Sequence, residues 1–201
     1  MCFNVFGIRV EITFLFVAFI AFILTMKVPS NVLITVVSSL IHEVGHILIM
    51  FILENRPEKV RFELTGINII RKQDMRISNK SEIIISLGGP LANAIILILC
   101  CLYLCFYKNN SILTFACINF ILMTFNLLPI KGLDGGSSLY FLMLQKYDSS
   151  FSAKIIYITS VVFIFLIFIW GIYAFASTNY NFSIIIIAIF LTLSLFSKNE
   201  Y

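Results

Sequence analysis

Long apolar stretches separated by short polar ones dominate the chain. Such stretches predict membrane-spanning helices, because a hydrocarbon core about 30 Å thick needs roughly 20 apolar residues to cross it. We predict about six spans, at residues 10–26, 32–53, 83–107, 112–146, 155–176 and 179–197. The fourth is expected to break near residues 129–135, where a proline and glycines interrupt the helical pattern. The expected fold is an all-α polytopic membrane protein with a single domain over residues 1–201.

The first span has a competing interpretation as a secretory signal peptide. Only one basic residue, Arg9, precedes it in this sequence, and no cleavage site of small residues follows it. Residues 27–30 instead resemble a turn, because Pro29 and Ser30 lie there. We therefore keep residues 10–26 as a span.

The region between the second and third spans, residues 54–82, has a different pattern. Residues 60–65 alternate between apolar and polar side chains, which is typical of a half-buried strand. Gly66 interrupts this run, and residues 67–69 resume an extended pattern. We predict a short β-hairpin or sheet at the membrane edge, with a plain polar loop as the alternative.

Composition and charge agree with a membrane protein. Hydrophobic residues make up 60% of the chain and charged residues 12%, a balance unlike that of a soluble domain. Six spans would place twelve of the fourteen Lys and Arg residues on the side of the N-terminus, leaving Lys27 and Lys108 on the other. This asymmetry predicts cytoplasmic termini and a cytoplasmic 54–82 insert. The basic residues form neither a motif nor a helical stripe, so no nucleic-acid partner is expected.

The five cysteines show no metal-binding spacing. Cys100, Cys101 and Cys105 lie within one apolar run, and no Cys-x-x-Cys pair occurs. We interpret them as small hydrophobic residues.

The strongest chemical signal is His42-Glu43-Val44-Gly45-His46, inside the second span. Residues four apart on a helix share a face, so His42 and His46 can direct an imidazole nitrogen at one metal ion. Glu43 follows the first ligand and is placed to accept a proton from water rather than to bind the metal. The chain has two histidines in all, and both are here. Two structural core histidines are the alternative, but polar groups within a span are usually functional.

A catalytic zinc site usually takes three protein ligands. Without a third histidine, the remaining ligand must be an acid or a cysteine. The acidic residues beyond Glu82 are Asp134, Asp148 and Glu200. Asp148 lies in a polar loop and Glu200 beside the C-terminus, so Asp134 in the broken fourth span is the best candidate. A turn aspartate before Gly135 is its alternative role.

The third span begins with small residues, from Ser86 to Ala94, which would let another helix approach closely. Pro90 predicts a local bend there. Asn93 could be a hydrogen-bonded packing residue or a site residue, and we favour packing.

These motifs together resemble the site-2 protease family of intramembrane zinc metalloproteases. The matching residues are the HExxH sequence, Gly88-Gly89-Pro90-Leu91-Ala92-Asn93, Asn126-Leu127-Leu128-Pro129 and Leu133-Asp134-Gly135-Gly136. The similarity covers almost the whole chain and is closest to the bacterial branch typified by the stage IV sporulation protease. HExxH alone occurs in many zinc proteases, whereas both motifs in this order within a membrane are highly specific.

The resemblance implies one Zn²⁺ per chain, with His42, His46 and Asp134 as ligands and Glu43 as the catalytic acid and base. It implies that Asn126 holds the substrate backbone. The substrate would be a membrane-associated protein cleaved in or near a transmembrane segment, such as a membrane-held transcription regulator or sigma-factor precursor. The protein is expected in the bacterial cytoplasmic membrane, with any regulatory partner unknown.

Two features depart from the pattern of the family. Many members have a proline directly after the asparagine, where this chain has Leu127. Neither a CBS domain nor a PDZ domain is expected in residues 1–201. A catalytically silent scaffold that binds substrate helices is the alternative function. A prenyl-type zinc protease would need a downstream glutamate ligand, and a transporter would leave the HExxH spacing unexplained.

Overall fold

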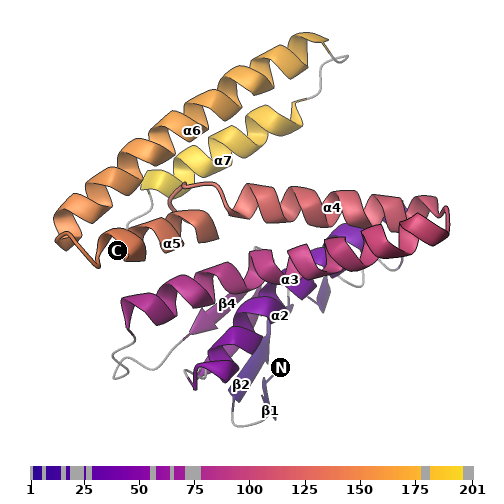
Figure 1. The fold of residues 1–201 in the computed structure, drawn as a ribbon, viewed down its shortest axis with the longest axis horizontal. Helices are drawn as coiled ribbons and strands as arrows, with labels where there is room; N and C mark the ends of the chain where they lie inside the picture. The colour runs from indigo at the N-terminus through magenta and orange to yellow at the C-terminus, as the bar shows by residue number, and fades with distance from the viewer. Residues whose placement is uncertain are drawn as a thin grey trace. The chain divides into compact units, whose positions relative to one another are not determined.

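The computed structural model describes most of the chain. The described residues are 2–5, 8–14, 17–18, 25, 29–54, 58–63, 66–70, 78–177 and 182–196. Within them the chain forms four strands and six helices (Figure 1): β1 (Cys2–Val5), β2 (Ile8–Ile12), α2 (Ser30–Ile52), β3 (Lys59–Glu63), β4 (Gly66–Ile70), α3 (Asn79–Phe106), α4 (Asn110–Asn126), α5 (Asp134–Met143), α6 (Ser149–Ser177) and α7 (Ser183–Phe196).

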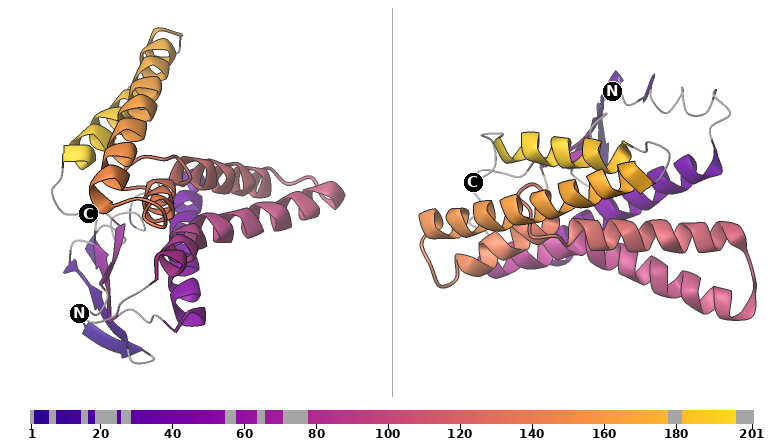
Figure 2. Two further views of the ribbon diagram at one scale, coloured as in Figure 1. Left: turned by 60° about the vertical axis from the view of Figure 1, so that its left-hand side comes forward. Right: turned by 90° about the horizontal axis from the view of Figure 1, so that it is seen from above.

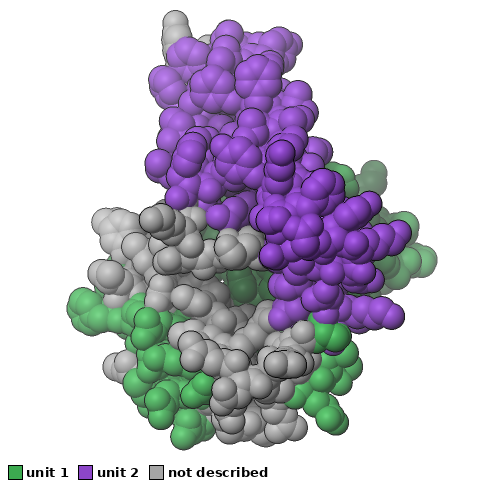
Figure 3. All heavy atoms as spheres, turned by 90° about the vertical axis from the view of Figure 1, so that its left-hand side faces the viewer, with its two compact units in different colours: residues 1–78, 88–123 green, residues 79–87, 124–201 purple. Residues whose placement is uncertain are grey.

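The chain divides into two compact units (Figure 3). Unit 1 comprises residues 1–78 and 88–123, and unit 2 comprises residues 79–87 and 124–201. The sheet, α2 and most of α3 and α4 therefore belong to unit 1, whereas α5, α6 and α7 belong to unit 2.

The sheet of unit 1 has the strand order β1-β2-β3-β4. β3 and β4 form the antiparallel hairpin expected from residues 60–69, with Val60 opposite Ile69. β2 pairs with β3 in parallel, and Val10 lies opposite Val60. Glu11 of β2 bridges the two strands, because its carboxylate lies 2.7 Å from Nζ of Lys59 and 3.2 Å from Nε of Arg61.

The first predicted span begins inside this sheet. Residues 10–12, which we assigned to the start of a helix, form the end of β2. Most of residues 13–26 lie outside the part of the chain that the structure describes. Six transmembrane helices are therefore not established.

Three of the described helices are long and apolar enough to cross a membrane, namely α2, α3 and α6. α4 and α7 are apolar but shorter, at 17 and 14 residues. α3 continues as a helix through Pro90. In unit 1, α2 and α3 meet at glycines, since a Cβ added to Gly45 would lie 2.4 Å from the carbonyl oxygen of Gly88. Small residues at this crossing let the two backbones touch.

The predicted fourth span is divided in the structure. α4 ends at Asn126 and α5 begins at Asp134, leaving residues 127–133 without helical structure. The start of α4 is capped by Asn109, whose Oδ1 accepts hydrogen bonds from the backbone N–H groups of Ser111 and Ile112 at 2.9 and 3.2 Å.

Asp148 caps α6 in the same way. Its Oδ2 accepts hydrogen bonds from the Ser150 hydroxyl and from the backbone N–H of Phe151. The Ser150 bond, aided by the Phe151 N–H, lowers the pKa of the Asp148 carboxyl below its ordinary value. The carboxylate is thereby held in the charged form that suits a helix N-terminus.

The core of unit 2 lies where α6 and α7 run side by side (Figure 2). Its buried members are Ile130, Ile164, Leu191 and Leu195. Ile130, which belongs to the 127–133 loop, is 0% exposed. The loop between α4 and α5 is therefore anchored in the apolar core of its own unit.

Candidate metal centre

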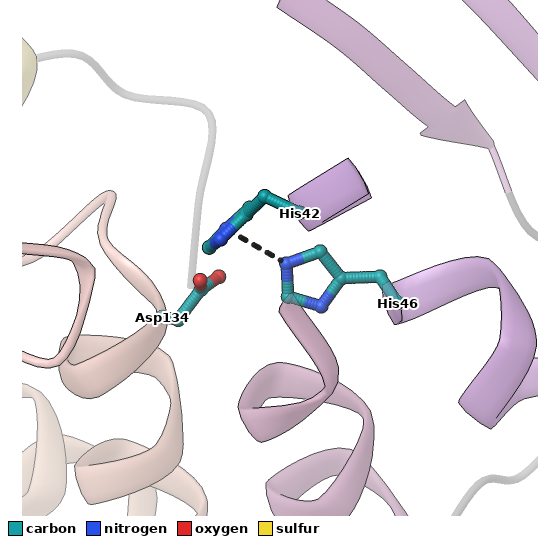
Figure 4. Close-up of side chains that lie close together, drawn as sticks. All are labelled: His42, His46 and Asp134. Carbon is teal, nitrogen blue, oxygen red and sulfur yellow. Dashed lines mark hydrogen bonds between the residues drawn. The ribbon is translucent and has the colours of Figure 1, made fainter. Parts of the chain in front are cut away.

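The two histidines of α2 share one face of the helix and lie in its buried part. His42 and His46 are 6% and 8% exposed. Their Nε2 atoms face each other at 3.3 Å, and the rings are nearly perpendicular (Figure 4). Two nitrogen ligands at about 2.0–2.1 Å from one tetrahedral zinc ion would stand roughly 3.3–3.4 Å apart. The pair is therefore spaced as two ligands of a single ion would be.

Gly89 of α3 lies directly against this pair. A Cβ on Gly89 would fall 2.5 Å from Nε2 of His42 and 2.5 Å from Nε2 of His46. The backbone N–H of Gly89 also donates to Nδ1 of His46 at 3.3 Å. The missing side chain thus leaves space beside both Nε2 atoms, and the backbone of α3 contacts Nδ1 of the His46 ring.

Asp134 is the first residue of α5 in unit 2 and is half-buried. With His42 and His46 it is the predicted third ligand of one metal ion, and this role stays a prediction. Two imidazole nitrogens and one carboxylate oxygen form a donor set that zinc accepts in catalytic sites. The residues present therefore suit the ion that the sequence suggests.

Glu43 and Asn126 are the remaining predicted site residues. Glu43 is half-buried in α2, beside His42 in the sequence. Asn126 is the last residue of α4 and is half-buried as well. Their predicted roles, as the proton-transferring base and as a holder of substrate backbone, stay predictions.

Gly135 and Gly136, which follow Asp134, lie directly against the backbone of the 127–133 loop. A Cβ on Gly135 would lie 2.1 Å from the carbonyl oxygen of Leu127, and one on Gly136 would lie 2.0 Å from that of Ile130. The loop therefore folds back over the first turn of α5, and only glycine leaves room for it. This contact holds Asp134 at the point where the loop joins the helix.

Buried polar residues near His42 were not predicted as part of the site. Ser38 lies one turn before His42 on α2, and its Oγ accepts a hydrogen bond from Nδ2 of Asn119 at 3.0 Å. Both residues are 0% exposed. The position of Ser38, four residues before a predicted ligand, could have indicated a buried polar contact there. The sequence does not indicate that its partner is Asn119 on α4, because that contact depends on tertiary packing.

Asn93 was expected to be a hydrogen-bonded packing residue. It is 0% exposed, as packing requires, and it lies one helical turn after Gly89. Among the described residues, however, neither its Oδ1 nor its Nδ2 has a hydrogen-bond partner. Its side chain therefore lies buried without the bond that we expected.

Comparison with known proteins finds a solved structure with the same fold and a relative with a similar sequence. No family model matches the chain. The solved structure of a site-2 protease from Methanocaldococcus jannaschii has the same fold, with a TM-score of 0.68 and 21% sequence identity over 100% of this chain and 95% of that one. A protein from Methanocaldococcus jannaschii that is named as a zinc metalloprotease is 28% identical over 165 residues. The chain thus shares the fold of that site-2 protease and is similar in sequence to that zinc metalloprotease.

The alignment with the named zinc metalloprotease covers 76% of this chain and 48% of that protein. The chain thus spans about half the length of that curated relative. A closer relation to the stage IV sporulation branch stays a prediction, because neither comparison addresses it. The same holds for a bacterial origin.

Proposed function

We propose that this site-2 protease relative is a zinc-dependent endopeptidase that cleaves membrane-associated proteins. The observation that carries the proposal is the pair of Nε2 atoms 3.3 Å apart, facing a position that Gly89 keeps free of side chain. In this proposal His42, His46 and Asp134 hold one zinc ion. The name of the relative, a zinc metalloprotease, supports the same chemistry.

The roles of the protein side chains follow from their chemistry. Bound zinc would supply a Lewis acid that activates water and polarises a scissile carbonyl. Glu43 would accept a proton as the attack on the carbonyl begins, and would later deliver one to the leaving amine. The Asn126 amide would hold the substrate backbone next to the reacting carbonyl.

A transmembrane substrate must be extended before its peptide bonds become accessible, because a helix uses its carbonyls in internal hydrogen bonds. An exposed sheet edge can hold an extended segment by adding it as a further strand. The alternating pattern of residues 60–65 predicts a strand that could provide this edge. That expectation is wrong, because β3 lies between β2 and β4. A substrate strand would instead add to β4 or β1, the outer strands of the described sheet.

The setting of the reaction is also part of the proposal. α2, α3 and α6 are long and apolar enough to lie in a lipid bilayer. The distribution of basic residues favours cytoplasmic termini and a cytoplasmic 54–82 insert, so that water and substrate would reach the site from that side. Cleavage there would suit regulated release of a membrane-held transcription regulator or the processing of a sigma-factor precursor.

The zinc content of detergent-purified protein tests the proposed centre. We expect about one zinc per chain in the wild type and a zinc affinity at least tenfold weaker in Asp134→Ala, because one of three protein ligands is lost. Asp148→Ala is the matched control, since it removes an aspartate that caps α6 and has no part in the centre.

Full zinc retention in folded Asp134→Ala would show that the third ligand has been misassigned. Folded wild-type protein that takes up no zinc would instead favour the alternative, a silent scaffold that binds substrate helices. A cleavage assay with a membrane-embedded peptide substrate then separates the scaffold from the protease.

A further inference from the structure

Two neighbouring hydroxyl groups of α6 hold the loop between α4 and α5. The Oγ1 of Thr159 lies 3.0 Å from the carbonyl oxygen of Pro129 and 3.0 Å from that of Ile156, so its one proton is shared between the loop and α6 itself. The backbone N–H of Lys131 donates to Oγ of Ser160 at 2.8 Å. The two bonds flank Ile130, so the loop is bound to α6 on both sides of that residue.

The side chain of Ile130 adds an apolar anchor between the two hydrogen bonds. It is 0% exposed and packs in the cluster with Ile164, Leu191 and Leu195. Three consecutive loop residues are thus fixed by a carbonyl, a side chain and an N–H in turn. We name the Thr159 and Ser160 hydroxyls, with these two loop bonds, the hydroxyl clamp.

The hydroxyl clamp provides hydrogen-bond partners for backbone groups that the break between α4 and α5 leaves without helical ones. Backbone groups released from a helix at membrane depth have no water to bind and must find partners within the protein. Ser160 is 0% exposed, and its hydroxyl also donates to the carbonyl oxygen of Ile156 at 2.6 Å. A serine that bonds its own helix is common. The additional bond from the Lys131 N–H is what joins the loop to α6.

Ser152 on the same helix shows the difference. It is also 0% exposed, and its hydroxyl donates to the carbonyl oxygen of Asp148 at 2.9 Å, four residues earlier. That bond lies at the start of α6 and involves no residue of the 127–133 loop. Burial of a serine in α6 is therefore separable from its contact with the loop.

We propose that Thr159 and Ser160 are positioning residues that fix Asn126 and Asp134 through the loop between them. The loop has Asn126 at one end and Asp134 at the other, so its conformation sets both. This inference rests on the proposed function for its catalytic consequence, although the clamp itself is a property of unit 2. Groups that do not bind the metal themselves but orient its ligands typically account for about 10–100-fold in metal affinity or activity.

The test combines four variants with two measurements. Thr159→Val and Ser160→Ala remove one hydroxyl each, Thr159→Ser retains the hydroxyl, and Ser152→Ala is the matched control. Zinc affinity is measured by competition with a chelator, and hydrogen exchange of residues 127–133 by mass spectrometry, both on the full chain in detergent. Thr159→Val and Ser160→Ala should bind zinc about 10–100-fold more weakly and exchange faster in the loop. Thr159→Ser and Ser152→Ala should resemble the wild type.

Wild-type zinc affinity in folded Thr159→Val and Ser160→Ala would overturn the positioning role, even if loop exchange increases. If both variants fail to fold, hydrogen exchange in the wild type tests the clamp instead. A Lys131 amide bound to Ser160 must exchange slowly, and fast exchange of this amide would overturn the clamp. Failure of the proposed function has a different signature. The wild type would then bind no zinc, while loss of either hydroxyl would still accelerate exchange in the loop.

Discussion

Replacing Glu43 with glutamine should abolish measurable peptide cleavage and leave zinc binding intact. The substitution keeps the size of the side chain but replaces one accepting oxygen with a donating NH2 group and removes the ability to take a proton. A positioned acid or base typically contributes about 10²–10⁴-fold to a rate. We therefore expect cleavage of a membrane-embedded peptide to fall by at least about 10²-fold. Zinc per chain should match the wild type, because the proposed ligands are His42, His46 and Asp134.

The matched control for this prediction is Glu54→Gln. Glu54 lies just beyond the end of α2, is exposed, and has no proposed part in the site. Its substitution should leave cleavage and zinc content at the wild-type level. Turnover by Glu43→Gln within a few-fold of the wild type would remove Glu43 from the mechanism. Loss of zinc in that variant would give Glu43 a structural or ligating role instead.

The histidine pair could be predicted from the sequence because its geometry is local. Positions four apart on a helix share a face whatever the rest of the chain does. The break before Asp134 was equally local, since proline and glycines interrupt a helix by their own chemistry. Both features require only the residues within about two turns, and the structure has the pair in α2 and the break at residues 127–133.

The strand β2 shows how a local signal can be masked. Residues 8–12 alternate between apolar and polar side chains, the pattern that identified β3. A long apolar run follows them, and for this reason residues 10–12 are predicted as the start of a membrane span rather than as the end of a strand. The parallel pairing of β2 with β3 joins segments separated by the whole of α2, and no local pattern specifies such a partner. This pairing is what moves β3 away from the sheet edge.

The hydroxyl clamp could not be predicted for a related reason. Thr159 and Ser160 lie in a long apolar helix, where isolated hydroxyls usually bond their own backbone. Ser152 does so, and nothing in the sequence distinguishes it from Ser160. Only the folded chain shows which hydroxyl faces the 127–133 loop. The sequence thus identifies groups that would bind metal, whereas the groups that position them depend on packing.

Replacing Gly89 with alanine should remove zinc binding while leaving the helices folded. The new Cβ would lie 2.5 Å from the Nε2 atoms of both His42 and His46, far inside van der Waals contact, and would occupy the space beside the ligand nitrogens. Alanine favours a helix by about 1 kcal/mol over glycine. Overpacking costs typically about 1–3 kcal/mol. The gain offsets part of the cost and leaves a net loss of about 0–2 kcal/mol, so we expect a folded protein with zinc affinity lowered about 100-fold or more and no cleavage.

Gly171→Ala on α6 is the matched control for Gly89→Ala. It makes the same substitution inside a helix, but its nearest neighbours are Cγ1 and the backbone N of Ile185, at 3.0 and 3.2 Å, which need to move by only a few tenths of an ångström. Zinc content and cleavage should stay at the wild-type level there. Circular dichroism in detergent, read beside zinc content, separates a lost site from a lost fold. Gly89→Ala that keeps wild-type zinc affinity would mean that the ion binds away from Gly89, and the His42–His46 pair would need a different metal geometry.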